Sequence, residues 1–138
     1  MIIVLLIVTA LLWGATPIIE KIGLKEVDPF IGLTIRSAVV TGGLLILTLM
    51  FGKGRELIEL DKKSILIFGA SGILAGLLAM WTYYAALKME ATSKIVPIAA
   101  CYPLVTVGLS ILALKEDITF SRVLGTGLIV AGVWLAKP

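Results

Sequence analysis

The chain has 138 residues, of which 59% are hydrophobic and 15% are charged, and its mean hydropathy is +1.11. A soluble domain carries about 25% charged residues, so this composition excludes an ordinary soluble domain and indicates an integral membrane protein. The net charge of +3 is small and spread over the loops, which suits anionic lipid headgroups and gives no reason to expect nucleic acid as a partner.

Runs of about 18 or more uncharged residues are long enough to cross the hydrocarbon of a bilayer as helices. We therefore predict an all-α integral membrane protein, a bundle of five transmembrane helices in a single domain covering residues 1–138. The predicted spans are residues 2–24, 29–51, 64–87, 93–114 and 118–136. Because no basic segment precedes the first apolar run, we expect that run to be retained as a span rather than removed as a signal.

Three of the spans have recognisable starts. Asp28 followed by Pro29 is typical of an N-cap and a first helical turn. Asp61 is a suitable N-cap for the third span, and Thr92 or Ser93 for the fourth.

The fifth span is the weakest prediction. Only Val123–Ala136 is uncharged, so a full crossing requires a start at Ile118 with Arg122 extending towards the headgroups. Glycine pairs in the third and fifth spans predict close helix packing, either within one subunit or, for the fifth span, between subunits.

The positive charges divide evenly between the two faces of the membrane. On the face of the N-terminus lie Lys53, Arg55, Lys62, Lys63, Lys115 and Arg122, and on the other face lie Lys21, Lys25, Arg36, Lys88, Lys94 and Lys137. Orientation normally follows an excess of Lys and Arg in the cytoplasmic loops. Without that excess, we expect the chain to insert in both orientations, a dual topology.

A cluster of charged residues is predicted at one membrane face, where the first and third spans end and the second begins. It comprises Glu20, Lys21, Arg36 and Lys88, with Glu90 and Lys94 nearby. Charged residues within spans are costly and mark functional sites. Two interpretations stay open: inert ion pairing, or a charged gate or substrate-docking site at one mouth of a cavity. Glu20 is the one acid placed within a span, and hence the candidate there for proton coupling.

Aromatic and proline residues within the spans form a second predicted site. Trp13 and Tyr102 lie too deep to be interfacial anchors, and Trp81 and Tyr84 share a helix face. A pocket of aromatic side chains with few polar groups suits a small organic molecule. The predicted substrate-binding residues are Trp13, Pro17, Trp81, Tyr84, Tyr102 and Pro103, with the prolines bending their helices; plain packing is the alternative.

Signatures of catalysis and of cofactor binding are missing. Histidine is absent and Cys101 is the single cysteine, so we expect neither a disulfide nor a metal site, and no cofactor. Without histidine no serine–histidine–aspartate set is possible, and no glycine-rich phosphate loop occurs. We therefore predict that the protein is not an enzyme.

Taken in order, these residues resemble one EamA domain of the drug/metabolite transporter superfamily. The resemblance rests on Trp13-Gly14 with Lys21 and Gly23, on Pro29 with Arg36 and Ala38, on Tyr83 to Lys88, on Pro103 with Glu116, and on Gly125 to Trp134. Members of the family usually carry two such domains in inverted topology. The resemblance therefore implies an antiparallel homodimer, similar to the five-helix bacterial and archaeal members, in the cell membrane of a prokaryote.

The function implied is that of a permease that moves a small organic solute, such as an amino acid, a metabolite or a drug-like compound, by alternating access. The related small multidrug-resistance proteins carry a glutamate deep in the first helix, but Thr9 to Ile19 contains no acid here, so proton-coupled drug antiport is not expected. The alternative is a non-transporting membrane subunit or a component of a lipid-linked flippase.

Overall fold

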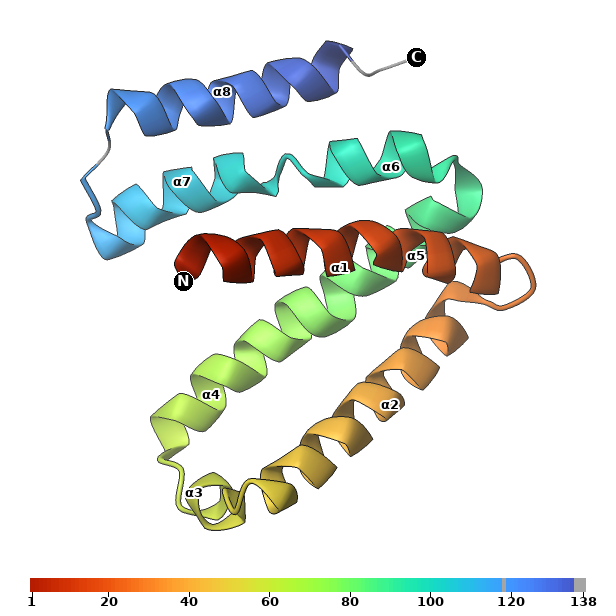
Figure 1. The fold of residues 1–138 in the computed structure, drawn as a ribbon, viewed down its shortest axis with the longest axis vertical. Coiled ribbons are helices and arrows are strands. Elements are labelled where there is room, and N and C mark those ends of the chain that lie inside the picture. Colours follow the sequence, from red (N-terminus) through yellow and green to blue (C-terminus); the bar gives the residue numbers. More distant parts are fainter. Residues whose placement is uncertain (118, 136–138) are drawn as a thin grey trace. The chain divides into compact units, whose positions relative to one another are not determined.

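The computed structural model describes residues 1–117 and 119–135, and every regular element in this part of the chain is a helix (Figure 1). The helices form two units, residues 1–89 and residues 90–138. Each unit is described by itself below.

The first unit contains three long helical stretches and one short helix. Helix α1 spans Ile2–Gly23, α2 spans Pro29–Met50, and the short α3 spans Gly54–Ile58. Helix α4 (Lys62–Ser71), the π-helix η1 (Gly72–Ala79) and α5 (Met80–Met89) then follow one another without a break. π-helical segments are rare and frequently lie at functional sites, and no feature of the sequence predicted this one.

The second unit consists of α6 (Thr92–Ala99), α7 (Tyr102–Leu114) and α8 (Phe120–Leu135), with α7 packed on α8. The predicted fourth span is therefore divided at Ala100 and Cys101. Pro103 lies in the first turn of α7, where the absence of an amide hydrogen costs no helical hydrogen bond. Helix α7 ends at Leu114, and its C-cap residue Lys115 takes the left-handed conformation with φ of 52°.

Four helical stretches are long and apolar enough to cross a membrane: Ile2–Gly23, Pro29–Met50, Lys62–Met89 and Thr92–Leu114. They agree with the first four predicted spans to within two residues at each end. Helix α8 has 16 residues, fewer than the roughly 20 that a perpendicular crossing needs. The fifth span stays a prediction, and residues 118 and 136 at its ends lie outside the described residues.

Two of the predicted helix starts are confirmed and one is wrong. Asp28 Oδ1 accepts hydrogen bonds from the amides of Phe30 (2.8 Å) and Ile31 (3.4 Å). Asp61 accepts one from the amide of Ser64 at 3.1 Å. Before α6, however, the N-cap is Ala91, and Thr92 is already helical, so neither hydroxyl predicted to cap this helix does so.

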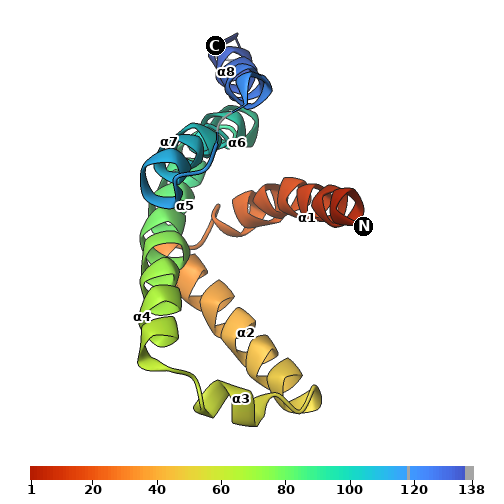
Figure 2. The same cartoon turned by 90° about the vertical axis from the view of Figure 1, so that its left-hand side faces the viewer.

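Very few apolar side chains are buried. Among the described residues, the buried hydrophobic ones are Leu24, Leu33, Tyr84 and Leu87, from the end of α1, the start of α2 and α5. Most other large apolar side chains are exposed, as expected for helices that face lipid or other helices. Figure 2 shows the arrangement of the helices within the first unit. Helix α2 packs against α5, but α2 and α4 diverge towards α3, which leaves their facing side chains exposed.

The glycine pairs do not mediate close contacts in the described structure. A Cβ atom added at Gly72, Gly76, Gly125 or Gly132 would meet no atom within 4 Å outside its own stretch of helix. The packing predicted for these glycines is therefore not made within either unit.

Candidate functional site

The carboxylate of Glu20 joins three helices of the first unit. Its Oε1 atom accepts a hydrogen bond of 2.7 Å from the hydroxyl of Tyr84 and lies 3.6 Å from Nε of Arg36. The side chain of Glu20 is only 9% exposed, whereas that of Arg36 is 40% exposed. A carboxylate with so little exposure needs such partners, because an unpaired charge in an apolar environment is strongly unfavourable.

Helical spacing explains why these residues meet beside the buried cluster. Leu24 follows Glu20 by four positions, and Leu87 follows Tyr84 by three, so each pair shares a face of its helix or helix end. Leu33 precedes Arg36 by three on α2 in the same way. Packing of the three leucines therefore brings α1, α2 and α5 together and places the polar groups next to one another.

Two lysines bind backbone carbonyl groups at the same end of the unit. Lys21 Nζ donates to the carbonyl oxygens of Leu87 (2.5 Å) and Lys88 (3.2 Å), and Lys88 Nζ donates to that of Val27 at 2.8 Å. The last carbonyls of a helix lack intrahelical partners and carry partial negative charge, so an ammonium group is favourable there. These bonds fasten the end of α5 to α1 and to the loop that follows it.

A cavity of about 210 Å³ adjoins the carboxylate. Its lining includes Glu20, Gly23, Val27, Gly32 and Ile35, together with the buried side chains of Leu24 and Tyr84. A Cβ atom added at Gly32 would lie 3.5 Å from Leu24 Cδ2 and 3.7 Å from Tyr84 Cε2, so α2 approaches both side chains closely here. The cavity is mostly apolar apart from the carboxylate and the hydroxyl of Tyr84.

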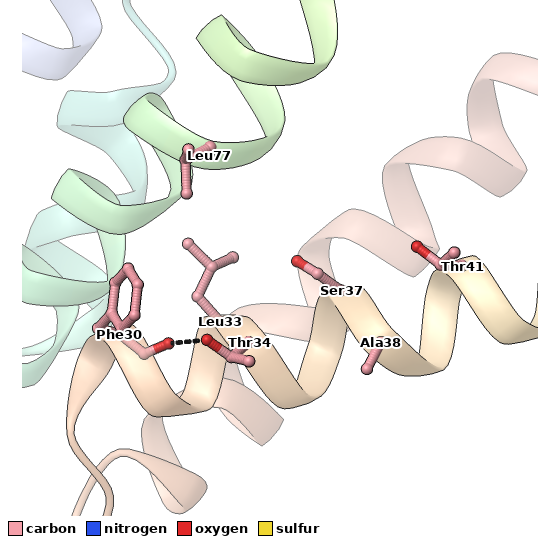
Figure 3. A pocket seen from close by; sticks show the side chains of 7 residues that line it. All are labelled: Phe30, Leu33, Thr34, Ser37, Ala38, Thr41 and Leu77. Carbon is pink, nitrogen blue, oxygen red and sulfur yellow. Dashed lines mark hydrogen bonds between the residues drawn. The ribbon is translucent and has the colours of Figure 1, made fainter. Parts of the chain in front are cut away.

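A larger pocket, of about 430 Å³, lies between α2 and η1. It is lined by Phe30, Leu33, Thr34, Ser37, Ala38, Thr41 and Leu77. Figure 3 shows Leu77 opposite α2, with the hydroxyls of Ser37 and Thr41 on the side of α2 that carries Leu33. The pocket thus combines apolar walls with a row of hydroxyl groups along one helix.

The hydroxyls of Ser37 and Thr41 make no hydrogen bond to any described residue, which is unusual in this unit. Thr34 donates to the carbonyl oxygen of Phe30 at 2.8 Å, and four other threonines likewise donate to the carbonyl four residues earlier: Thr9, Thr16, Thr48 and Thr82. Two unsatisfied hydroxyls within an apolar span are available to a bound molecule. Sequence reasoning missed them, although the spacing of positions 34, 37 and 41 along one helix face was visible.

Within the described first unit, no ring contact joins the predicted aromatic residues Trp13, Trp81 and Tyr84 to one another. Trp81 is 47% exposed and meets Phe30 edge to face, with ring centroids 6.1 Å apart. Trp13 is 66% exposed, and neither tryptophan lines any of the cavities described in residues 1–89. Tyr84 lines the cavity of about 210 Å³ that adjoins Glu20.

The remaining predicted residues are placed as follows. Pro17 is buried within α1, which continues through it. Tyr102 and Pro103 belong to the second unit, where Tyr102 is exposed and Pro103 is half-buried. Lys94 forms an ion pair of 3.3 Å with Glu90, also in the second unit.

No group of three or more potential metal ligands occurs among the residues that the structure describes.

Comparison with known proteins identifies the family. The model of the EamA-like transporter family matches residues 1–137. The chain is also 33% identical, over 93 residues, to an uncharacterized protein of Methanocaldococcus jannaschii, an alignment that covers 67% of each protein. No solved structure matches the chain. Together with the apolar helices, the match confirms the family resemblance seen in the sequence: the chain is a multi-pass membrane protein that belongs to the EamA-like transporter family, whose members are transporters rather than enzymes.

Proposed function

We propose that the protein is a permease that moves a small organic solute through the membrane by alternating access between two antiparallel copies. The observation that carries this proposal is the pocket between α2 and η1, with the unsatisfied hydroxyls of Ser37 and Thr41 inside an apolar span. Small-molecule sites are mostly apolar concavities with a few polar groups that fix orientation. A solute with an apolar part and a hydrogen-bonding group suits such a pocket.

The cluster of Glu20, Arg36 and Tyr84, fastened by Lys21 and Lys88, acts in this proposal as the closed gate at one end of the unit. It holds α1, α2 and α5 together, and opening on that side requires these contacts to separate. Trp13, Pro17, Trp81, Tyr102 and Pro103 contribute to the solute pathway in the assembled transporter, as the sequence predicts.

Antiparallel pairing is supported by the even division of Lys and Arg between the two membrane faces, six on each. Transporters built from inverted halves bind their substrates between the halves near the middle of the bilayer, and rock around that site. A chain that inserts both ways supplies both halves from one sequence. The largely exposed apolar surfaces of the helices leave ample area for a second copy.

Transport by purified protein tests the proposal. Proteoliposomes that contain only this protein are loaded with a panel of labelled amino acids, amines and drug-like aromatics, and efflux is followed. We expect at least one solute to cross faster than in protein-free vesicles, and a Ser37→Ala, Thr41→Val double variant to slow it. Thr48→Val, at a hydroxyl bonded to the carbonyl of Leu44, is the matched control. If no solute moved, the alternative of a non-transporting subunit would replace the permease.

Orientation is tested separately with reporters fused after Pro138. A reporter active only in the cytoplasm and one active only outside the membrane should both give signal in dual insertion. A signal from one alone would exclude the antiparallel homodimer.

A further inference from the structure

We propose that Lys21, Lys25 and Lys88 form a binding site for a phosphate group, presented by an anionic phospholipid or by a phosphorylated solute. The three lysines and Leu24 line a cavity of about 110 Å³. This cavity is distinct from the hydroxyl-lined pocket between α2 and η1, with which it shares no residue. The side chains that line it carry three positive charges and no negative one.

Two of the ammonium groups are held in place by the backbone. Lys21 Nζ binds the carbonyl oxygens of Leu87 and Lys88, and Lys88 Nζ binds that of Val27. Because these two side chains are already ordered, a ligand that binds them loses less free energy to the entropic cost of ordering them. The lysines therefore form a partly organised site before any ligand arrives.

Donors remain for a ligand on two of the lysines. An ammonium group has three N–H donors, and Lys88 uses one of them on Val27. The ammonium group of Lys25 makes no hydrogen bond or ion pair with any described residue. Lys25 and Lys88 thus supply the hydrogen bonds, while Lys21 adds positive charge beside them.

The chemistry and position of the cavity favour phosphate. A phosphate group combines negative charge with several strong acceptor oxygens, and lysine binds it as a point charge. The cavity lies where α1 and α5 end, at the edge of the apolar spans rather than in their middle. Basic pockets at this depth between transmembrane helices bind anionic headgroups.

Direct binding to the protein in a maltoside detergent, which contains no phosphate, tests the proposal. Radiolabelled short-chain phosphatidylglycerol and radiolabelled inorganic phosphate are titrated in separate arms. We expect saturable binding that Lys25→Gln weakens about tenfold and Lys25→Gln with Lys88→Gln weakens about 100-fold, because each removes a charge-assisted contact. Binding of the lipid alone identifies a headgroup site, and binding of both ligands identifies a site for phosphate from either source.

The controls keep the test independent of folding and of transport. Lys25→Gln removes no hydrogen bond to the described residues, so it should leave the thermal stability unchanged, and Lys25→Arg should retain binding. Lys63→Gln, an exposed lysine at the start of α4, should bind like the parent protein. The phosphate site would be overturned if Lys25→Gln and the double variant with Lys88→Gln bound as strongly as the parent protein, or if neither the lipid nor inorganic phosphate bound. Either result would count whether or not the protein transports a solute.

Discussion

The hydroxyl of Tyr84 on α5 donates a hydrogen bond of 2.7 Å to the carboxylate of Glu20 on α1. Tyr84 is itself 3% exposed, so this bond lies at the edge of the small buried cluster of the first unit. It links two residues that are 64 positions apart in the sequence. The contact is therefore a sensitive measure of whether the first unit is correctly assembled.

Removal of that hydroxyl should destabilise the protein. Tyr84→Phe keeps the ring but deprives Glu20 of its hydrogen bond, and we expect a loss of about 1.5–3 kcal/mol, the usual range for a bond to a charged group. Unfolding by a denaturing detergent in mixed micelles measures the change. Tyr83→Phe, on the neighbouring half-buried ring, is the control and should change the stability by much less.

The ion pair of Glu20 and Arg36 should make the effects of substitutions at these two residues on the free energy of unfolding non-additive. Glu20→Gln retains an acceptor for Tyr84 but removes the charge, and Arg36→Gln removes the opposite charge. Each single variant leaves one charge without its partner, so the double variant should be more stable than the sum of the two changes predicts. We expect a coupling of about 1 kcal/mol, measured by a double-mutant cycle of unfolding free energies. Additive changes would show that the pair contributes nothing.

The cap of α4 gives a pH-dependent signal. The side-chain and backbone hydrogen bonds from Ser64 lower the pKa of Asp61 below its ordinary value of 3.8. Because the folded pKa is lower than the unfolded one, the stabilisation by this carboxylate is present above about pH 4 and is lost as the pH falls through the lowered pKa. NMR titration of the Asp61 carboxyl should show the low pKa, and Ser64→Ala should raise it towards the ordinary value. An unchanged pKa in Ser64→Ala would assign the shift to another cause.

Orientation should respond to small changes in charge. Lys62→Gln with Lys63→Gln leaves four positive charges on the face of the N-terminus against six on the other, so that other face should become predominantly cytoplasmic. Reporter fusions at the C-terminus measure the ratio of the two orientations. The converse double variant, Lys25→Gln with Lys94→Gln, should shift the ratio the other way. A ratio that responds to neither variant would show that these charges do not set the orientation.

Local features were predictable from the sequence, and long-range ones mostly were not. Asp28 and Asp61 could be recognised as caps because the backbone amides that donate to their carboxylates lie only two or three residues away. The lysine contacts of α5 could not be recognised, because every residue has a carbonyl oxygen and only packing decides which one an ammonium group reaches. The π-helix was also missed, since an uninterrupted apolar segment from Gly72 to Ala79 has the same composition in either kind of helix.

Because the buried cluster lies at one end of the first unit, α2 is held near its start and extends away from those contacts. Its 22 residues extend about 33 Å from the contacts with α5. A tilt of about 10° at the clamped end would therefore displace the far end, next to α3, by about 6 Å. In the proposed permease, a separation of Glu20 from Arg36 and Tyr84 that let α2 tilt by this angle would thus move its far end by about one helical turn.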